Sequence, residues 1–526
     1  MQRQAFLAAL SFAVFQSLLE EWMFQNPQGY QLLRNLQQGG TGRTWFLVTS
    51  LVSFFLLVFF AWFALSLPRR WRWAPFVVFS LAVLVAFNYW QLFHREFVPG
   101  DITTAITAPL SMWNASMSIY FSPWSLLPLL VFGGILCLPG QPSKKGTLGL
   151  AAAMAACIVL NILAAWLSPV VNWGTSLPKF YQTVVQWSMA DARYVSRLEV
   201  NYRSTTRPEN NIVLIIDESI RSDHLSLNGY ERPTTPFLDE LAATTDMVHN
   251  WGTVSAGATC STPSNPLLIS GVIVQPDAQE LHELMRQYPT IFQYAKAMGY
   301  QTAYLDAQTN YLWNGLRPED LQFVDEWITV DDLGGGLAVD HHAADWIFNR
   351  VSQSSGHFIV LNKHGAHYLY EDSYPPEEEI WAPVPTDYQQ QPELVSNVYD
   401  NSIHYTVNGF FQRLRLGEEA AVQNTFYIYT SDHAQTLFEN GVNWLHCNYT
   451  KTEASVPLLL IGNVQQQLDY TYAASHANIF ATLLDLMGVP RDARLVEYAP
   501  SLFDAHAGLN RPRFFLSGGG LIVPFD

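Results

Sequence analysis

Acidic, histidine and hydroxyl residues gather at four places in the second half of the chain, where their types suit metal or phosphate chemistry. The first place is Glu218, which closely follows an apolar run over 212–216. A short aliphatic run bounded by polar residues predicts a buried strand of a parallel sheet. Ligands of such sheets bind at the carboxyl ends of the strands, so Glu218 would meet a metal or a substrate. The alternative is an acid that only caps the following helix.

Asp432-His433 form the second place, since they follow an apolar run over 425–429 that predicts another strand. A carboxylate oxygen and an imidazole nitrogen are ligands that suit Zn²⁺, so this pair predicts a metal site. His364 and His367 form the third place, after a further predicted strand. Two histidines three apart in a strand-ending loop suit metal or phosphate binding. Loop histidines without a function are the alternative.

Ser261 lies in the fourth place, the stretch 255–271, which combines small hydroxyl and thiol residues with a predicted helix start. Pro263 and Ser264 follow it and place Ser261 at the amino-terminal end of that helix. Free N–H groups and the positive end of the helix dipole favour an anion there, such as a phosphate. The alternative is an ordinary N-cap serine or threonine.

An alternation of strands and helices brings these four places to one edge of a sheet. The predicted strands cover 212–216, 301–305, 357–361, 425–429 and 456–461. Helical patterns between them cover 235–243, 290–298, 340–352, 396–414 and 476–486. This alternation predicts one doubly wound, mainly parallel α/β domain over 211–526. A stretch rich in Pro, Glu and Gln, 371–393, is predicted to be a long excursion near the site.

The front of the chain has a different character. Residues 1–176 carry nine Lys or Arg and four Asp or Glu, a net charge of +5. The whole chain carries −17, which leaves −22 for residues 177–526. A basic, apolar front and an acidic remainder predict a membrane part and a part in water. So negative a second part argues against nucleic acid as a partner.

Five apolar runs predict five membrane-spanning helices and a transmembrane domain over 1–170. The runs cover 5–19, 45–67, 74–93, 122–138 and 147–169. The first could be a signal peptide, but Glu20-Glu21 follow it in place of a small-residue cleavage site. Basic residues after the second and fourth runs predict the cytoplasmic side, so the chain after the fifth run lies on the other side. Residues 171–210 are predicted to be an amphipathic helix or a plain linker between the two parts.

The motifs in combination resemble the membrane-anchored phosphoethanolamine transferases of the alkaline phosphatase/sulfatase superfamily, of which the lipid A phosphoethanolamine transferases are the best known. The resemblance covers nearly the whole chain, since five spans followed by an outward catalytic domain are also that family's plan. It implies a second domain of the alkaline phosphatase/sulfatase type. The matching segments are Glu218-Ser219 with Arg221, Ser226–Tyr230, Arg232–Pro236, Tyr399–Ile403 with Tyr405-Thr406, Ser431–His433, Glu439–Gly441 with Leu445-His446, and Ser475-His476 with Thr482–Gly488.

Site residues can be carried over from this resemblance one by one. Three of them would be ligands of one tight Zn²⁺ site, with the oxygen of the nucleophile as the fourth: Glu218, Asp432 and His433. Three more would contact the transferred phosphoryl group or hold a second zinc ion: His364, His367 and His446. Asn362 stands where many relatives have a further histidine, which leaves its contact open. Asp217 is either another ligand or only a helix-capping neighbour.

The nucleophile of the family is usually threonine, and this chain departs from that pattern. Two alignments, one to the family's Ser-x-Pro spacing and one to the sulfatase Cys-x-Pro-Ser-Arg motif, both place Ser261 there. Thr259 is the second candidate and Cys260 the third. Asn265 replaces the sulfatase arginine, which argues against the formylglycine modification and against sulfate ester hydrolysis. Cys260 and Cys447 both adjoin site residues and could form a disulfide outside the cytoplasm; two free thiols are the alternative.

The resemblance implies transfer of phosphoethanolamine from phosphatidylethanolamine to an outer-leaflet glycolipid or glycan of the lipopolysaccharide type, through a covalent phospho-enzyme intermediate. The chain would be a multi-pass protein of the bacterial inner membrane with its catalytic domain in the periplasm. One alternative is a glycerophosphate transferase or phosphodiesterase of the lipoteichoic acid synthase type. Another is a membrane pseudoenzyme that senses lipid, against which the retained metal ligands argue.

Overall fold

The computed structural model describes residues 2–24, 41–93, 125–138 and most of 196–526, with short pieces at 102, 148, 151–152, 155, 180–181 and 183–184. Within 196–526 it leaves out 277–280, 313–314, 389, 439–445 and 519. The chain divides into two compact units, 1–194 and 195–526, and each is described by itself.

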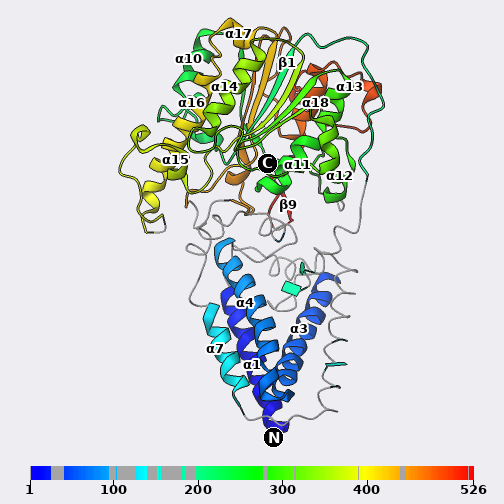
Figure 1. Ribbon diagram of the computed structural model, residues 1–526, viewed down its shortest axis with the longest axis vertical. Helices are drawn as coiled ribbons and strands as arrows, with labels where there is room; N and C mark the ends of the chain where they lie inside the picture. The colour runs from blue at the N-terminus through cyan, green and yellow to red at the C-terminus, as the bar shows by residue number, and fades with distance from the viewer. Residues whose placement is uncertain are drawn as a thin grey trace. The chain divides into compact units, whose positions relative to one another are not determined.

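Helices make up most of the described part of the first unit (Figure 1). They are α1 (Gln2–Phe24), α3 (Thr41–Ser66), α4 (Trp73–Phe93) and α7 (Leu126–Leu136). Their core is aromatic: the ring of Phe132 lies 4.8 Å from that of Phe12 and 4.6 Å from that of Phe79. Arg72, just before α4, donates to carbonyl oxygens near the ends of α3 and α7, among them Leu136 O at 2.8 Å. A cation at helix carboxyl ends satisfies carbonyls that the helices leave unpaired.

Among the helices in the described ranges, none is both long enough and apolar enough to cross a membrane. Three of these helices, α1, α3 and α4, lie over the first three apolar runs, 5–19, 45–67 and 74–93. In the described part of the fourth, 125–138, helix α7 covers Leu126–Leu136. The fifth, 147–169, lies almost wholly outside the described residues, and the bridging segment 171–210 is described only in part.

A seven-stranded sheet forms the centre of the second unit, in the order β2-β7-β6-β1-β5-β3-β4. The strands are β1 (Asn211–Asp217), β2 (Val248–Ser255), β3 (Gln301–Asp306), β4 (Glu326–Ile328), β5 (His357–Asn362), β6 (Thr425–Ser431) and β7 (Ser455–Ile461). Strands β6, β1, β5, β3 and β4 are parallel to their neighbours in that row, whereas β7 is antiparallel to both β6 and β2. The sheet is mixed and mainly parallel.

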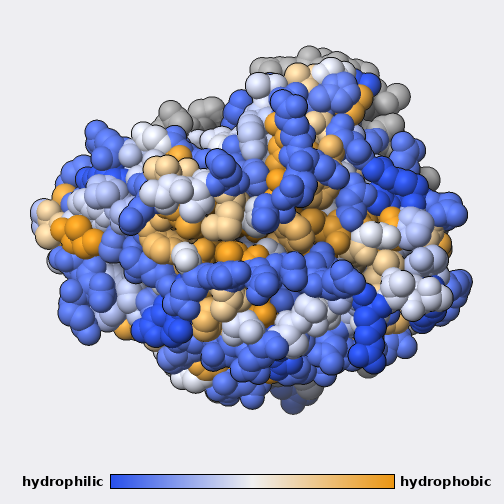
Figure 2. All heavy atoms as spheres, turned by 90° about the horizontal axis from the view of Figure 1, so that it is seen from above, coloured by the Kyte–Doolittle hydropathy of each residue, from blue (hydrophilic) through white to orange (hydrophobic). Residues whose placement is uncertain are grey.

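Helices cover both faces of this sheet (Figure 1), which is why β1 is a continuous apolar run buried along its whole length. Val213 and Ile215 face the layer of α10 (Pro236–Thr244), α14 (Val339–Val351), α15 (Val395–Ile403) and α16 (Gly409–Arg413). Ile212 and Leu214 face the layer of α11 (Ser261–Ser270), α13 (Ile291–Ala297) and α18 (Ala477–Leu486). Two further short helices lie in the described part of this unit, α12 (Leu281–Gln287) and α17 (Glu419–Val422). The surface in view in Figure 2 is mostly hydrophilic, with apolar side chains gathered near its middle.

All five predicted strands are confirmed, and so are the helices α10, α13, α14 and α18. The helix predicted over 396–414 is interrupted by a π-helical turn, His404–Asn408, between α15 and α16. β2 and β4 were not predicted, because β2 is a partly exposed edge strand that contains polar residues and β4 has only three residues. β7 is antiparallel: in the described part of 432–454, only the 3₁₀ turn Thr452–Ala454 lies between it and β6, and a parallel connection usually needs a helical crossover.

A separate hairpin of β8 (Phe514–Leu516) and β9 (Ile522–Pro524) supports the segment that leads into α11. Leu516 donates from its N–H to Gly257 O at 2.9 Å, and its carbonyl accepts from Thr259 N at 3.0 Å. These two bonds fix the backbone immediately before Ser261.

Candidate metal centre and nucleophile

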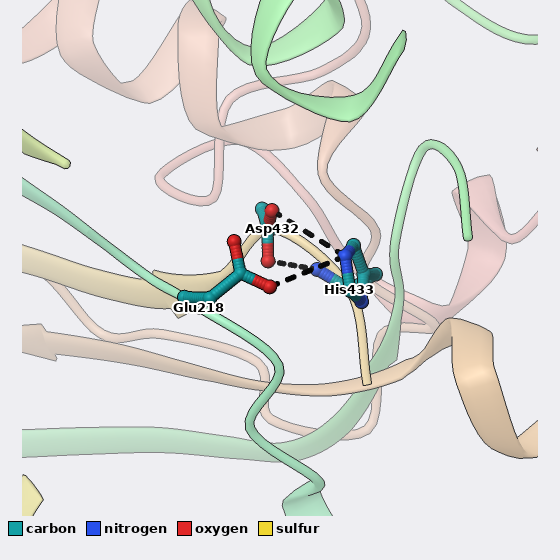
Figure 3. A group of neighbouring side chains, drawn as sticks. All are labelled: Glu218, Asp432 and His433. Carbon is teal, nitrogen blue, oxygen red and sulfur yellow. Dashed lines mark hydrogen bonds and ion pairs between the residues drawn. The ribbon is translucent and has the colours of Figure 1, made fainter. Parts of the chain in front are cut away.

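The ends of β1 and β6 bring together three side chains that could hold a metal ion: Glu218, Asp432 and His433 (Figure 3). The two strands are parallel neighbours, and Asp217 lies opposite Ser431 in their register. The residues that follow the strands therefore emerge side by side. One possible ligand atom from each lies within 4.8 Å of the others, and all three residues are buried.

Hydrogen bonds orient two of these side chains. Asp432 Oδ1 accepts from the N–H groups of Ser219 (3.2 Å) and His433 (2.7 Å), whereas Oδ2 is buried and accepts no hydrogen bond from the residues described. His433 Nδ1 donates to Ala434 O at 3.0 Å, which leaves the lone pair on Nε2. This Nε2 lies 3.4 Å from Glu218 Oε1 and 3.6 Å from Asp432 Oδ2. Carboxylate oxygens and a bare imidazole nitrogen thus face one point, an arrangement that a cation would complete.

Burial and the repulsion between two carboxylates govern the charge of this group. Burial raises the pKa of Asp432 well above its usual range, and the charge of Glu218 adds to the effect. Burial also raises the pKa of Glu218, but positive charge on His433, His367 and His446 outweighs it and lowers that pKa to about 2. Burial lowers the pKa of His433, while the charge of Glu218 acts in the opposite direction. A divalent cation would relieve the repulsion between the two acids.

Ser261 is the first residue of α11 and its hydroxyl adjoins the same group. Its Oγ lies 3.1 Å from Glu218 Oε2 and 3.1 Å from His433 Nε2. Ser264, within the first turn, donates from its hydroxyl to Asp432 O and so ties the helix to the end of β6. The predicted helix start at Ser261 is confirmed. A hydroxyl beside metal ligands at a helix N-terminus is placed where a metal could activate it as a nucleophile.

The other two nucleophile candidates are engaged elsewhere. Thr259 is fully buried and donates from Oγ1 to Asn448 O at 2.7 Å. Cys260 forms a disulfide with Cys447, and their Cα atoms are 4.8 Å apart. The pairing that the sequence left open is therefore present, and it fastens the residue before Ser261 to a second site segment.

Further histidines surround the group. The ring of His446 stacks on that of His433, with centroids 4.5 Å apart. His364 and His367 follow β5 with their ring centroids 6.0 Å apart, and burial lowers the pKa of His364. The segment 439–445, which includes part of the motif predicted to contact phosphate, lies outside the described residues. Contact of these histidines with phosphate or a second metal stays a prediction.

Asn362 and Asp217, whose roles the sequence left open, have partners outside the group. Asn362 donates from its amide to Asp306 Oδ1 at 3.3 Å. Asp217 Oδ2 accepts from Lys363 Nζ at 2.5 Å and from the hydroxyl of Tyr429 at 2.9 Å. The sequence suggested that Asp217 is either another metal ligand or a helix-capping neighbour. Neither suggestion includes its pairing with Lys363.

Two residues that the sequence analysis did not select contact the group or its supports. Gln308, after β3, donates from Nε2 to Glu218 Oε2 (3.2 Å) and to Lys363 O (2.7 Å). Lys363 follows β5 and is fully buried. Both follow strand ends at the edge that carries Glu218, and this position is the signal that could have found them. By residue type alone, a glutamine and a lysine in a loop are usually solvated.

Glu453 is a buried acid that holds the segment after the disulfide. Its carboxyl group accepts from Asn448 N (2.7 Å), Asn448 Nδ2 (2.9 Å) and the hydroxyl of Thr450 (2.9 Å). Its backbone carbonyl accepts from Ala434 N at 2.7 Å. Burial raises the pKa of Glu453 from 4.5 to about 8, although these hydrogen bonds to the side chain act in the opposite direction.

We expect Glu453→Gln to weaken the dependence of stability on pH. Native Glu453 keeps a proton between pH 4.5 and about 8 that the unfolded chain has released. Stability therefore falls as the pH rises through that window and is constant above it. Glutamine does not titrate, so this contribution disappears. Melting temperatures measured from about pH 5 to about pH 9 test the expectation, with Glu240→Gln at an exposed acid as control. An unchanged slope in Glu453→Gln would contradict it.

A comparison with protein families gives the class of the chain. The family model described as Sulfatase matches residues 210–489, which is more than half of the chain. The chain belongs to this family. The predicted membership of the alkaline phosphatase/sulfatase superfamily is thereby confirmed.

Individual relatives share most of the chain's length at low identity. Kdo(2)-lipid A phosphoethanolamine 7''-transferase of Salmonella typhimurium is 24% identical over 503 residues, which cover 85% of this chain and 84% of the relative. Phosphoethanolamine transferase EptA of Escherichia coli strain K12 is 28% identical over 312 residues, 53% of this chain and 54% of the relative. The structure of the integral membrane protein lipooligosaccharide phosphoethanolamine transferase A from Neisseria meningitidis matches with a TM-score of 0.64 at 18% identity, covering 91% of this chain and 95% of that one. The last match shows a shared fold.

Proposed function

We propose that the chain is a metal-dependent transferase that moves phosphoethanolamine from phosphatidylethanolamine to a hydroxyl or phosphate of an envelope glycolipid of the lipid A type. The observation that carries the proposal is Ser261 Oγ at the start of α11, 3.1 Å from both Glu218 Oε2 and His433 Nε2. The relatives are named as phosphoethanolamine transferases that act on Kdo(2)-lipid A or lipooligosaccharide. These names are the basis for the proposed transferred group and the proposed class of acceptor.

The proposed cofactor is Zn²⁺, held by Glu218, Asp432 and His433. Two carboxylates and an imidazole with a bare Nε2 are a donor set that suits this ion. When bound there, Zn²⁺ would lower the pKa of the neighbouring hydroxyl and neutralise negative charge that develops at phosphorus. His367 and His446 are proposed to contact the phosphoryl oxygens, or with His364 to hold a second ion.

The proposed reaction has two displacements at phosphorus. Ser261 Oγ forms a bond to the phosphorus of phosphatidylethanolamine while the bond to the glycerol oxygen breaks, and diacylglycerol leaves with the proton that the serine has lost. The acceptor oxygen then attacks the phosphorus of the serine adduct. Ser261 is released with a proton from the acceptor, and the acceptor carries phosphoethanolamine.

We also propose that the first unit anchors the chain in the bacterial inner membrane and that the catalytic domain, 211–526, lies in the periplasm. Three observations support this: the apolar, basic front of the sequence, the likeness to an integral membrane protein, and the disulfide between Cys260 and Cys447. Disulfides form and persist outside the reducing cytoplasm. This location places the site beside lipid donors and glycolipid acceptors.

The deciding experiment reconstitutes the full chain in vesicles with Zn²⁺, lipid A and phosphatidylethanolamine labelled in its headgroup. We expect mass spectrometry to find labelled phosphoethanolamine on lipid A and an equal amount of diacylglycerol. Phosphatidylglycerol is the comparison donor. Transfer of glycerophosphate from that lipid in preference to phosphoethanolamine would replace the proposal with the lipoteichoic acid synthase type of reaction, and no turnover of either lipid by the zinc-loaded protein would refute both.

A further inference from the structure

The ammonium group of Lys363 is buried at the carboxyl edge of the sheet, directly behind the proposed metal site. The residue has no exposed surface. Its Nζ donates to Asp217 Oδ2 at 2.5 Å and to Thr406 O at 2.7 Å, and it lies 3.8 Å from Asp340 Oδ2. A fully buried charge is costly unless it is paired and hydrogen-bonded. The chain meets that requirement here with two acids and a carbonyl.

The first of the two acids controls the backbone of a proposed metal ligand. Asp217 Oδ1 accepts from the N–H of Glu218 at 3.0 Å, while its Oδ2 accepts from Lys363 and from Tyr429. Both carboxylate oxygens of Asp217 therefore accept hydrogen bonds, one from Lys363 and the other from the backbone of Glu218. One carboxylate therefore links the ammonium group to the backbone of Glu218.

The second acid controls the loop that carries the proposed phosphate-binding histidines. Asp340, in the first turn of α14, accepts at Oδ1 from the N–H of His364 (2.8 Å) and at Oδ2 from the N–H of Gly365 (2.9 Å). Lys363 lies against the same Oδ2. The loop that leads to His367 is thus held by the group that pairs with the lysine.

The loop and the metal ligand also touch directly. A Cβ atom on Gly365, whose φ is +57°, would lie 2.4 Å from Asp217 Oδ1 and 2.8 Å from Glu218 N. The N–H of Ala366 donates to Glu218 O at 3.1 Å. Only a glycine in this backbone conformation permits so close an approach. The loop at Gly365 and the backbone of Glu218 are therefore packed directly against each other. Lys363 is the positive charge next to both acids, Asp217 and Asp340.

A break in a helix supplies the third partner of the ammonium group. Thr406 belongs to the π-helical turn His404–Asn408 between α15 and α16. Such a turn disturbs the regular pattern of backbone hydrogen bonds. The carbonyl oxygen of Thr406 accepts a hydrogen bond from Lys363 Nζ. The ring of Phe410, in α16, lies 4.6 Å from Nζ and covers another side of the charge. The lysine is enclosed by protein, so it acts on the site through its neighbours.

We propose that Lys363 is a positioning residue that sets the place of Glu218 relative to the loop of His364 and His367. The inference rests on the proposed function, because it assigns roles to the same metal ligand and histidines. Neutral residues would fill the space, but they would not hold the two carboxylates at a fixed separation. Residues that orient metal ligands from behind commonly change metal affinity or activity about tenfold to hundredfold when replaced.

The test compares Lys363→Met with the double variant Lys363→Met/Asp217→Asn in the full-length protein. The single variant leaves two buried carboxylates, Asp217 and Asp340, without their shared partner. The double variant removes the charges of Lys363 and of its nearer acid and keeps an oxygen that can accept from Glu218 N, while Asp340 keeps its two backbone donors. Lys296→Met, which removes a partly exposed lysine paired with Asp325, is the matched control. Zn²⁺ affinity, melting temperature, kcat and KM for phosphatidylethanolamine are measured for each protein.

We expect the double variant to melt close to the wild type, yet to bind Zn²⁺ about tenfold to hundredfold more weakly and to lose kcat by a similar factor. KM for the lipid should stay within about twofold, since the lipid does not touch Lys363. A folded double variant with wild-type Zn²⁺ affinity and kcat overturns the proposal. So does a double variant that fails to fold, because the pair would then be needed for folding and not for placement. If the wild type transfers no phosphoethanolamine, the proposed function fails, and the Zn²⁺ affinities still decide the role of Lys363.

Discussion

Ser261→Ala is expected to reduce transfer by about 10⁴-fold or more and to abolish the covalent adduct, because loss of a nucleophile removes both displacements. The hydroxyl contacts the side chains of the proposed metal ligands and no backbone group of the helix start, so alanine should leave the helix start and the metal ligands in place. Zn²⁺ content and melting temperature should therefore remain close to those of the wild type. Steady-state transfer and intact-protein mass spectrometry after exposure to phosphatidylethanolamine measure the two effects.

Thr259→Ala is the matched control, since it deletes the hydroxyl of the competing candidate two residues away. That hydroxyl is bonded to Asn448 O, so we expect a loss of at most about tenfold and an intact adduct. Peptide mapping of the wild type should find phosphoethanolamine on Ser261. An adduct on Thr259, or transfer that survives in Ser261→Ala and is lost in Thr259→Ala, would reverse the assignment.

Asp432→Asn is expected to weaken Zn²⁺ binding by about a hundredfold or more and to reduce transfer at least as strongly. The amide keeps an oxygen for the N–H groups of Ser219 and His433, but it offers the ion no negative charge. Without metal the variant should be as stable as the wild type or more so, because one of two buried, mutually repelling acids has been neutralised. Added Zn²⁺ should raise the melting temperature of the wild type far more than that of the variant.

Asp331→Asn, at an exposed acid, controls for the loss of one negative charge. Chelation of the wild type should reproduce the inactivity of Asp432→Asn, and added Zn²⁺ should restore the wild type alone. Equal stabilisation of the wild type and Asp432→Asn by Zn²⁺ would show that the ion binds elsewhere. A chelated wild type that retains full transfer would remove the metal from the reaction.

Strands were the most predictable part of the fold. The apolar runs at 212–216 and 425–429 are unbroken because β1 and β6 are covered by helices on both faces. A strand buried on both faces has apolar residues at successive positions, which makes it easy to recognise in a sequence. The edge strand β2 was missed because its polar residues face partly outward and its place is fixed by pairing with β7, which is about 200 residues away in sequence. In the first unit, the first three predicted apolar segments coincide with helices α1, α3 and α4, although no helix in the described residues is both long and apolar enough to cross a membrane.

Residue types at strand ends selected much of the candidate site. Glu218, Asp432 and His433 are acids and a histidine where apolar runs stop, and the parallel register of β1 and β6 then brings them together. Ser261 was selected by its helix start and by motif spacing. Its distances to the other three come from the packing of α11 on the sheet, a contact between segments about 170 residues apart in sequence that no local pattern encodes.

The sequence by itself determined the α/β class, the sheet edge that bears the site and the residue types for metal and phosphate chemistry, because burial and strand ends are local properties of a chain. Only the tertiary structure decided which neighbours those residues have. In the folded chain, the hydroxyl of Thr259 donates to Asn448 O, Cys260 forms a disulfide with Cys447, and Asp217 pairs with Lys363. A lysine in a loop is ordinarily solvated, and only the folded arrangement of β1, α14 and the π-helical turn after α15 makes this one a buried counter-charge. Long-range packing, which sequence spacing does not record, gives the site its geometry.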